Sequence, residues 1–264
     1  MSSVDPRRSL ELLLPEVEAL NAEVARLSAE QWQAPSNCAG WQIGDLLAHV
    51  VRNGWSFLVF VRNALTGETN PAFGPAVQRV QDEIKAAGPQ AAAERQARET
   101  DQFVGLVRGL SEADLGRQAQ HPRGLRSVAW ACSQRLVEVA FHRWDLRRSL
   151  GYNGPLNGEL ARHLLDFMLD PASVSIMTDL PPHAPPDTFR LVAGGSAWRV
   201  TVGPNGRRIE PRAAGPASLE IVAEPGWLAL ALYGRVPIEG QPFRLEGLPE
   251  ARRRFQLAFG GQPA

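Results

Sequence analysis

The chain has 264 residues and a formal charge of zero, because 28 lysine and arginine residues balance 28 aspartate and glutamate residues. This length is enough for one large domain or two smaller ones with cores of their own. A neutral chain has no field that would collect nucleic acid or an anionic membrane, so neither partner is expected. Hydrophobic residues make up 44% of the sequence, yet none of their runs reaches the roughly 18 to 20 residues of a membrane-spanning helix.

The N-terminus and the cysteines indicate the compartment. Met1 to Pro6 lead straight into an amphipathic segment and lack the basic start and apolar stretch of a signal peptide. The two cysteines, Cys38 and Cys132, are too few for a disulfide framework and have no CxxC spacing. We therefore expect a cytoplasmic protein with two free thiols. Either thiol could be a nucleophile, but neither has an adjacent base, and a buried inert thiol is the preferred interpretation of Cys132.

Apolar residues recur at helical spacing through the first half of the chain. Asp5-Pro6 supplies a cap and a first-turn proline for the first segment. The predicted helices span Asp5 to Leu27, Ile43 to the turn at Thr66-Gly67, Pro71 to Leu110 with a break at Gly88-Pro89, and Ser127 to Leu150. Because no strand pattern lies among them, these segments predict an antiparallel four-helix bundle over roughly residues 1 to 150.

The pattern changes in the second half. One more helical segment runs from Asn157 to Phe167, and a proline-rich stretch from Pro171 to Pro186 predicts a linker. Alternating strands and short helical stretches then follow, at Thr188 to Val192, Trp198 to Val202, Leu219 to Val222, Gly226 to Tyr233, Phe243 to Leu245 and Pro249 to Phe259. We predict a two-domain α+β fold, with a helical bundle in residues 1–170 and a small α+β domain in residues 185–264.

Three side chains on two predicted helices suggest a metal site. Glu138 and His142 are four residues apart and so share one helical face. His49 lies on the second helix, with Asp45 one turn before it. If the two helices face each other, His49, Glu138 and His142 supply two nitrogens and one carboxylate, which is the ligand set of a catalytic zinc site with an open position.

Simpler interpretations of these residues stay open. A Glu/His pair at this spacing is common on solvated helices, although the apolar neighbours Val137 and Phe141 predict burial, where a bare carboxylate is costly unless it is paired or metal-bound. Asp45 either favours the helix dipole or bonds His49. Asp145 either orients His142 or pairs with Arg148. Three further histidines are interpreted as ordinary residues without a site role: His121, His163 and His183.

Two motifs resemble a known family. Gly40 to Val50, and the segment Glu138 to Leu146 some ninety residues later, resemble the mycothiol-dependent maleylpyruvate isomerase family. Leu230 to Arg235 and Phe243 to Phe255 resemble its C-terminal half more weakly. The resemblance implies a DinB-like four-helix bundle followed by a small sterol-carrier-like α+β domain. It also implies a divalent ion, usually zinc, held by His49, Glu138 and His142, with a low-molecular-weight thiol, mycothiol, as cosubstrate.

The chemistry that this resemblance implies agrees with the ligand set. A thiol at the open position would lose its proton near neutral pH, because the ion stabilises the thiolate. The thiolate could isomerise a cis alkene by addition, rotation and elimination, or could be transferred to an electrophile. An arginine of the C-terminal domain is implied to help bind an anionic substrate; Arg235 stands in the matching motif, and Arg244 is the substitute.

Other function classes use the same residues. The chain could be a non-catalytic protein that binds small molecules, or a hydrolase whose nucleophile is a metal-bound water on the same ligands. Metal analysis followed by a thiol-consumption assay discriminates among them. We expect a small-molecule substrate and a thiol as partners, and a monomer or weak homodimer in solution.

Overall fold

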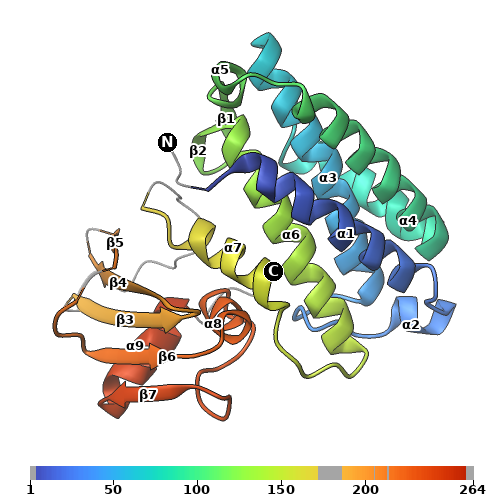
Figure 1. Ribbon diagram of the computed structural model, residues 1–264. Helices are drawn as coiled ribbons and strands as arrows, with labels where there is room; N and C mark the ends of the chain where they lie inside the picture. Colours follow the sequence, from blue (N-terminus) through green and yellow to red (C-terminus); the bar gives the residue numbers. More distant parts are fainter. Residues whose placement is uncertain (1–3, 172–185, 205, 213, 260–264) are drawn as a thin grey trace. The chain divides into compact units, whose positions relative to one another are not determined.

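The computed structural model describes residues 4–171, 186–204, 206–212 and 214–259, which form two compact units. The first unit covers residues 5–153 and is mainly helical, and the second begins at Gly154 and contains a mixed sheet (Figure 1). The predicted two-part α+β fold is therefore confirmed. Most of the predicted proline-rich linker, and His183 within it, lie outside the described residues.

Long helices build the first unit. They are α1 (Pro6–Val24), α3 (Ile43–Thr66), α4 (Gln78–Arg108) and α6 (Val128–Ser149). Local signals set their ends: Asp5 caps α1 by accepting from the Arg7 backbone N–H, and Gly67 ends α3 with a φ of 80°. Gly88 has a φ of 85° inside α4, which places the kink at the predicted break.

The directions of the helices differ from the expected antiparallel arrangement. Helices α1 and α6 lie side by side (Figure 1) and run parallel, because Ser9 bonds Ser133 at 2.8 Å near their starts and Glu23 pairs with Arg143 at 2.9 Å near their ends. Helical periodicity identifies the buried face of each helix but carries no information about its direction, so the sequence could not distinguish the two arrangements.

Helices α3 and α4 also run parallel. Asp45 near the start of α3 pairs with Lys85 at 2.7 Å, and Gly54 further along α3 lies beside Glu99. The segment between α3 and α4 allows the parallel arrangement, because it turns back toward the start of α3. Phe73 in this segment packs its ring 6.0 Å from the ring of Phe57, in the middle of α3. Helices α3 and α6 are antiparallel, and this pair carries the predicted metal ligands.

Short elements that the sequence did not predict connect the long helices. They are α2 (Ala29–Gln33), the 3-10 turn η1 (Pro75–Val77), α5 (Glu112–Leu115) and a hairpin of β1 (Gln118–His121) and β2 (Gly124–Ser127). The expectation of no strands in this half was wrong, because four-residue strands are too short to show an alternating pattern. Gly124, with a φ of 92°, closes the hairpin.

The second unit contains a five-stranded sheet among its described residues, with the order β5-β4-β3-β6-β7. Strands β3 and β6 pair in parallel and the other neighbours are antiparallel. Its elements are α7 (Gly158–Met168), β3 (Asp187–Ala193), β4 (Ser196–Gly203), β5 (Gly206–Pro211), β6 (Leu219–Val222), α8 (Pro225–Leu232), β7 (Arg244–Gly247) and α9 (Pro249–Phe259). By its contacts α7 belongs to this unit, and the boundaries at 170 and 185 stay a prediction.

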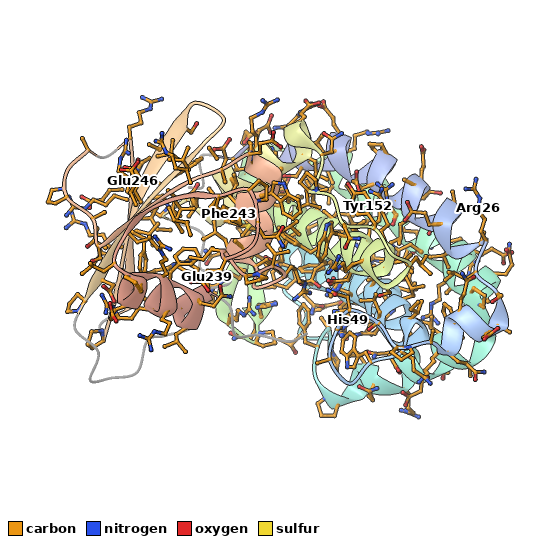
Figure 2. All side chains as sticks on the ribbon, turned by 90° about the horizontal axis from the view of Figure 1, so that it is seen from below. Arg26, His49, Tyr152, Glu239, Phe243 and Glu246 are labelled. Carbon is orange, nitrogen blue, oxygen red and sulfur yellow. The ribbon has the colours of Figure 1, made fainter. Side chains whose placement is uncertain are left out.

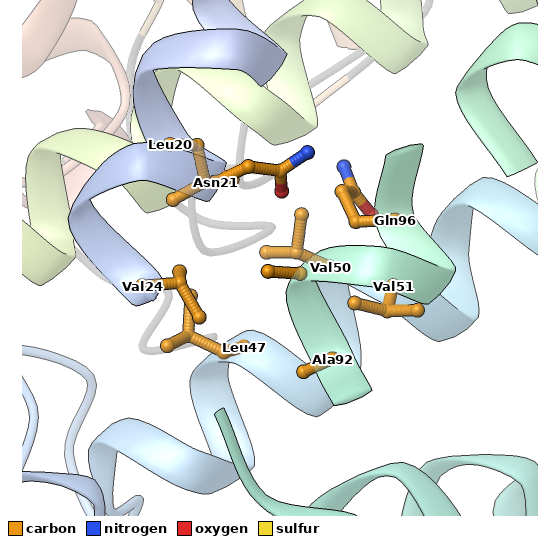
Figure 3. Close-up of a pocket in the computed structure, with 9 residues that line it drawn as sticks. Leu20, Asn21, Val24, Leu47, Val50, Val51, Ala92 and Gln96 are labelled. Carbon is orange, nitrogen blue, oxygen red and sulfur yellow. The ribbon is translucent and has the colours of Figure 1, made fainter. Parts of the chain in front are cut away.

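A small apolar pocket lies between α1, α3 and α4 (Figure 3), and the amides of Asn21 and Gln96 reach into it from α1 and α4. Its other lining residues are Leu20, Val24, Leu47, Val50, Val51, Ala92 and Ala93. The predicted metal ligands are not among these residues, so the pocket belongs to the core and not to the site. Within the described part of the chain, every helix is too short or too polar to cross a membrane.

A buried arginine makes Gly54 necessary in the middle of α3. Arg135 on α6 is 1% exposed and donates from Nη1 to the Val50 carbonyl oxygen at 3.0 Å. A Cβ on Gly54 would lie 2.8 Å from Arg135 Nη2 and 3.4 Å from Glu99 Oε2. Because Arg135 is buried and bonded to α3, a Cβ on Gly54 would displace its guanidinium, so the glycine keeps the space in which this side chain lies.

We predict that Gly54→Ala destabilises the protein while Gly105→Ala does not. Overpacking against Arg135 costs about 1–3 kcal/mol, which exceeds the roughly 1 kcal/mol that alanine gains over glycine inside a helix. Gly105 on α4 is the matched control, because a Cβ there meets no atom within 4 Å. Urea unfolding midpoints measure both effects. Equal stability of the two variants would contradict the steric role of Gly54.

Candidate metal centre

The predicted ligands come together between α3 and α6. His49, labelled in Figure 2, places Nε2 3.4 Å from Glu138 Oε2, and His142 places its own Nε2 3.5 Å from the same oxygen. Glu138 and His142 share a face because they are one turn apart on α6, and the antiparallel α3 brings His49 opposite them. The structure therefore joins the three residues that the sequence singled out.

The spacing of these atoms fits a divalent ion. Two ligand atoms that are each about 2.0–2.1 Å from a tetrahedral zinc ion lie about 3.3–3.4 Å from one another, which agrees with the 3.4 and 3.5 Å separations. The side chains of His49 and Glu138 are 19% and 15% exposed, so an exogenous fourth ligand can reach the group. His142 is buried. Two nitrogens and one carboxylate with room for a fourth ligand are the donors that open zinc sites use, so the group is a candidate metal site.

The three groups differ in charge. Burial lowers the pKa of His49 to about 4, so this imidazole is neutral at pH 7. Burial alone would raise the pKa of Glu138, but hydrogen bonds from His142 and His49 hold it well below its usual range. Burial likewise opposes the charged form of His142, but contacts with Asp145, Cys38 and Glu138 raise its pKa well above the usual value. Of the two imidazoles, His142 is therefore the one that holds a proton more readily.

Asp145 orients His142, which was one of its two predicted roles, the other being an ion pair with Arg148. Its Oδ2 lies 3.1 Å from His142 Nδ1, and the carboxylate is fully buried. A carboxylate at Nδ1 fixes the hydrogen of the ring on that side and directs Nε2 toward Glu138.

Asp45 stabilises the start of its own helix, α3, and its carboxylate oxygens bond groups other than His49. Its Oδ2 accepts from the Gln42 backbone N–H at 3.0 Å and its Oδ1 pairs with Lys85, so it caps α3. The hydrogen bond from Asp45 to His49 was a wrong alternative, because a first-turn carboxylate points back to the helix start. The neighbour of His49 Nδ1 is instead Arg52, whose Nη2 lies 2.8 Å away.

The Arg52 contact selects one tautomer of His49. A guanidinium only donates hydrogen bonds, so His49 Nδ1 accepts and the ring hydrogen is on Nε2, directed to Glu138. An ion at Nε2 needs that hydrogen on Nδ1 instead, so Arg52 and the ion compete for the same ring. Sequence reasoning missed Arg52, although its position three residues after His49 places both on one helix face.

A second group of potential ligands shares His142. Among the described residues, Cys38, His142 and Asp145 also bring ligand atoms within 4.8 Å of one another. Cys38 Sγ lies 3.4 Å from Asp145 Oδ2, and all three residues are buried. This enclosed group leaves no access for an exogenous ligand, which distinguishes it from the partly exposed group around Glu138.

The remaining residues considered from the sequence lie elsewhere. Both cysteines are free and buried, and burial raises the pKa of Cys132 to about 12, which agrees with the prediction of an unreactive thiol. His121 packs against Phe73 and Trp130, at ring distances of 4.7 and 4.9 Å. A residue that sequence reasoning missed is Gln134, which donates to Glu138 Oε1 at 3.1 Å from one turn earlier on α6.

The two arginines considered for substrate binding are in the second unit. Arg235 follows α8, and its guanidinium lies 5.1 Å from the ring centre of Tyr233. Arg244 on β7 is 67% exposed at its side chain and lies 3.8 Å from Glu220 and 3.5 Å from Glu246. Glu220 is shared with Arg190 of β3, so the contacts of Arg244 are those of an exposed ion-pair network.

Comparisons with known proteins agree with this fold. Residues 13–147 match the family model described as the mycothiol maleylpyruvate isomerase N-terminal domain. Crystal structures of the mycothiol-dependent maleylpyruvate isomerase and of a mutant of it superpose with TM-scores of 0.64 and 0.63. In each case the identity is 16%, over 89% of this chain and 92% of the other. No curated protein matches the sequence.

We predict that the purified protein carries about one divalent ion per chain, as expected for a single three-ligand site. His49→Ala, Glu138→Ala and His142→Ala should each lower the bound metal at least about tenfold, since each removes one ligand. His121→Ala is the matched control, because it removes a histidine of the same unit that lies outside the group. Elemental analysis measures the content. Full occupancy in Glu138→Ala would remove that carboxylate from the ligand set.

Metal binding should release about one proton per ion at pH 7, because His142 must lose its hydrogen at Nε2 before it can bind. Its raised pKa means that lower pH weakens binding, with apparent affinity falling about tenfold for each pH unit below 7. Calorimetric titration in buffers of different ionisation enthalpy counts the protons. Affinity that stays constant between pH 6 and 8 would show that His142 is not protonated in the metal-free protein.

Proposed function

Because the chain belongs to the mycothiol maleylpyruvate isomerase N-terminal domain family, we propose that it is a divalent-metal-dependent enzyme that activates a low-molecular-weight thiol. The observation that carries this proposal is the convergence of His49, Glu138 and His142 at the spacing of an ion's ligands. Zinc is the proposed metal and mycothiol the proposed thiol. The product is either the trans isomer of a small cis alkene or a thioether formed by S-transfer.

The ligand set suits this chemistry. A zinc ion with two histidine nitrogens, one carboxylate and an open position stabilises a thiolate near neutral pH. Neighbouring residues orient the ligands that would hold the ion. Asp145 orients His142, and Gln134 fixes the second oxygen of Glu138. The nucleophile comes from outside the chain, since Cys132 is inert and the Cys38 thiol faces Asp145.

Arg235 is proposed to bind the carboxylate of an anionic substrate. A guanidinium pairs with a carboxylate in two parallel hydrogen bonds, which is why arginine suits this task. Arg235 is preferred to Arg244, because Arg235 stands in the motif that resembles the family. Two buried free thiols agree with a reducing compartment, so we propose a cytoplasmic protein that acts as a monomer or weak homodimer.

The test is turnover of a cis-alkene carboxylate by zinc-loaded protein, with isomer formation and thiol consumption measured together. We expect turnover only with added mycothiol or a surrogate thiol, and the variant Cys38→Ser/Cys132→Ser should still turn over because its nucleophile is external. Arg235→Met should raise the KM about ten- to hundredfold, the equivalent of a charge-assisted bond of about 1.5 to 3 kcal/mol. Arg244→Met is its control and should change the KM little.

Other outcomes point to the other function classes. Turnover without any thiol would indicate a metal-bound water as the nucleophile and hence a hydrolase. Inertness of metal-loaded protein toward electrophiles would favour a protein that binds small molecules. Loss of activity in Cys38→Ser/Cys132→Ser with the metal still bound would contradict the external thiol.

A further inference from the structure

The loop between α2 and α3, residues 34–42, has a closed shape held by its own backbone. Ser36 N–H donates to the Trp41 carbonyl at 2.8 Å, and Ile43 N–H donates to the Ala34 carbonyl at 2.9 Å. Inside this frame the Trp41 N–H bonds the Cys38 carbonyl at 3.0 Å. Because both ends of the loop are tied together, the side chains on it have fixed positions.

This loop contacts both histidines of the candidate centre. On one side the ring of Trp41 lies 5.1 Å from the ring of His49. On the other side Asn37 Nδ2 donates to Asp145 Oδ1 at 2.9 Å, and Cys38 Sγ donates to Asp145 Oδ2 at 3.4 Å. The same Oδ2 lies 3.1 Å from His142 Nδ1. The loop thus reaches His142 through one shared carboxylate, and the Cys38 thiol also contacts the imidazole itself.

Asp145 needs these donors. A fully buried carboxylate is costly unless hydrogen bonds satisfy it. Here His142, Cys38 and Asn37 supply three hydrogens to its two oxygens. Since Cys38 and His142 bond the same Oδ2, the thiol fixes the oxygen that orients the imidazole. Removal of the thiol takes one hydrogen bond from that oxygen, so the direction of the imidazole ring is then set less precisely.

We propose that Cys38 is a positioning residue of the metal centre, whose thiol holds Asp145 against His142 and so directs His142 Nε2 toward the ion. This inference rests on the proposed function, because it needs an ion at His49, Glu138 and His142. Cys38 is not a ligand in this arrangement: its Sγ donates to a carboxylate, and the group it forms with His142 and Asp145 is enclosed.

The test is binding of Co²⁺ by the full chain, followed by displacement with Zn²⁺, for wild type, Cys38→Ala and Cys38→Ser. We expect wild-type protein to bind Co²⁺ without a near-ultraviolet sulfur-to-cobalt charge-transfer band. Cys38→Ala should bind about ten- to hundredfold more weakly, the range typical of lost ligand-orienting partners. Cys38→Ser should stay within about threefold of wild type, because a hydroxyl still donates to Asp145.

Two further variants separate positioning from general destabilisation. Cys132→Ala removes the other buried thiol, whose described hydrogen bond goes to the Val128 carbonyl of its own helix. This variant should bind Co²⁺ as wild type does. Asn37→Ala removes the second donor to Asp145 at an exposed position, so it tests the same arrangement if Cys38→Ala does not fold, and should weaken binding severalfold. Melting temperatures of the metal-free variants show whether affinity falls beyond what stability explains.

The outcomes distinguish this proposal from the proposed function. Wild-type protein that does not bind Co²⁺ would overturn the proposed function and this inference with it. Normal wild-type binding with equal affinity in Cys38→Ala overturns this inference alone. A sulfur-to-cobalt band in wild type that disappears in Cys38→Ser would make Cys38 a ligand, and equal losses in Cys38→Ala and Cys132→Ala would indicate a packing effect; either result also overturns it.

Discussion

Glu138 on α6 is a carboxylate with only 15% of its side chain exposed, and the cost of shielding its charge from water decides what can surround it. A buried ion that lacks partners loses several kcal/mol of hydration, on the order of what folding as a whole provides. Hydrogens from His49 and His142 meet Oε2, and Gln134 meets Oε1. The atoms that satisfy the charge also have the spacing of zinc ligands. The Glu138 charge could thus be neutralised either by hydrogens of the two histidines or by a divalent ion. The Arg52 contact favours the first, because it leaves the His49 hydrogen on Nε2.

The sequence predicted the part of the site that helix geometry determines. Glu138 and His142 had to share a face, and the helix that carries His49 was recognisable from its apolar spacing. The roles of Asp45 and Asp145 could not be decided from the sequence, because each carboxylate had two possible roles within one helical turn. Contacts in the folded chain show that Asp45 pairs with Lys85 and Asp145 with His142. Cys38 and Asn37 come from an irregular loop, whose side-chain directions follow from tertiary contacts and not from periodicity.

The fold was predicted to a similar depth. Apolar spacing located the long helices and the break at Gly88, because these depend on local chemistry. The parallel α1–α6 and α3–α4 pairs depend on how the connections run, and the pattern of a helix is the same in both directions. Strand β5 was missed because Arg207, Arg208 and Glu210 interrupt its apolar alternation at the edge of the sheet.

The parallel pairing of the first and last long helices affects how the protein folds during synthesis. Ser9 and Ser133 are 124 residues apart in the chain, and His49 and Glu138 are 89 apart. Contacts between residues so far apart in the chain form late and make folding slower, because the entropy of closing a long loop is lost before the contact stabilises the chain. At typical translation rates of about 5–20 residues per second, α3 waits on the order of 5 to 20 s for α6. Metal uptake would therefore report completion of the helical unit and could not nucleate it.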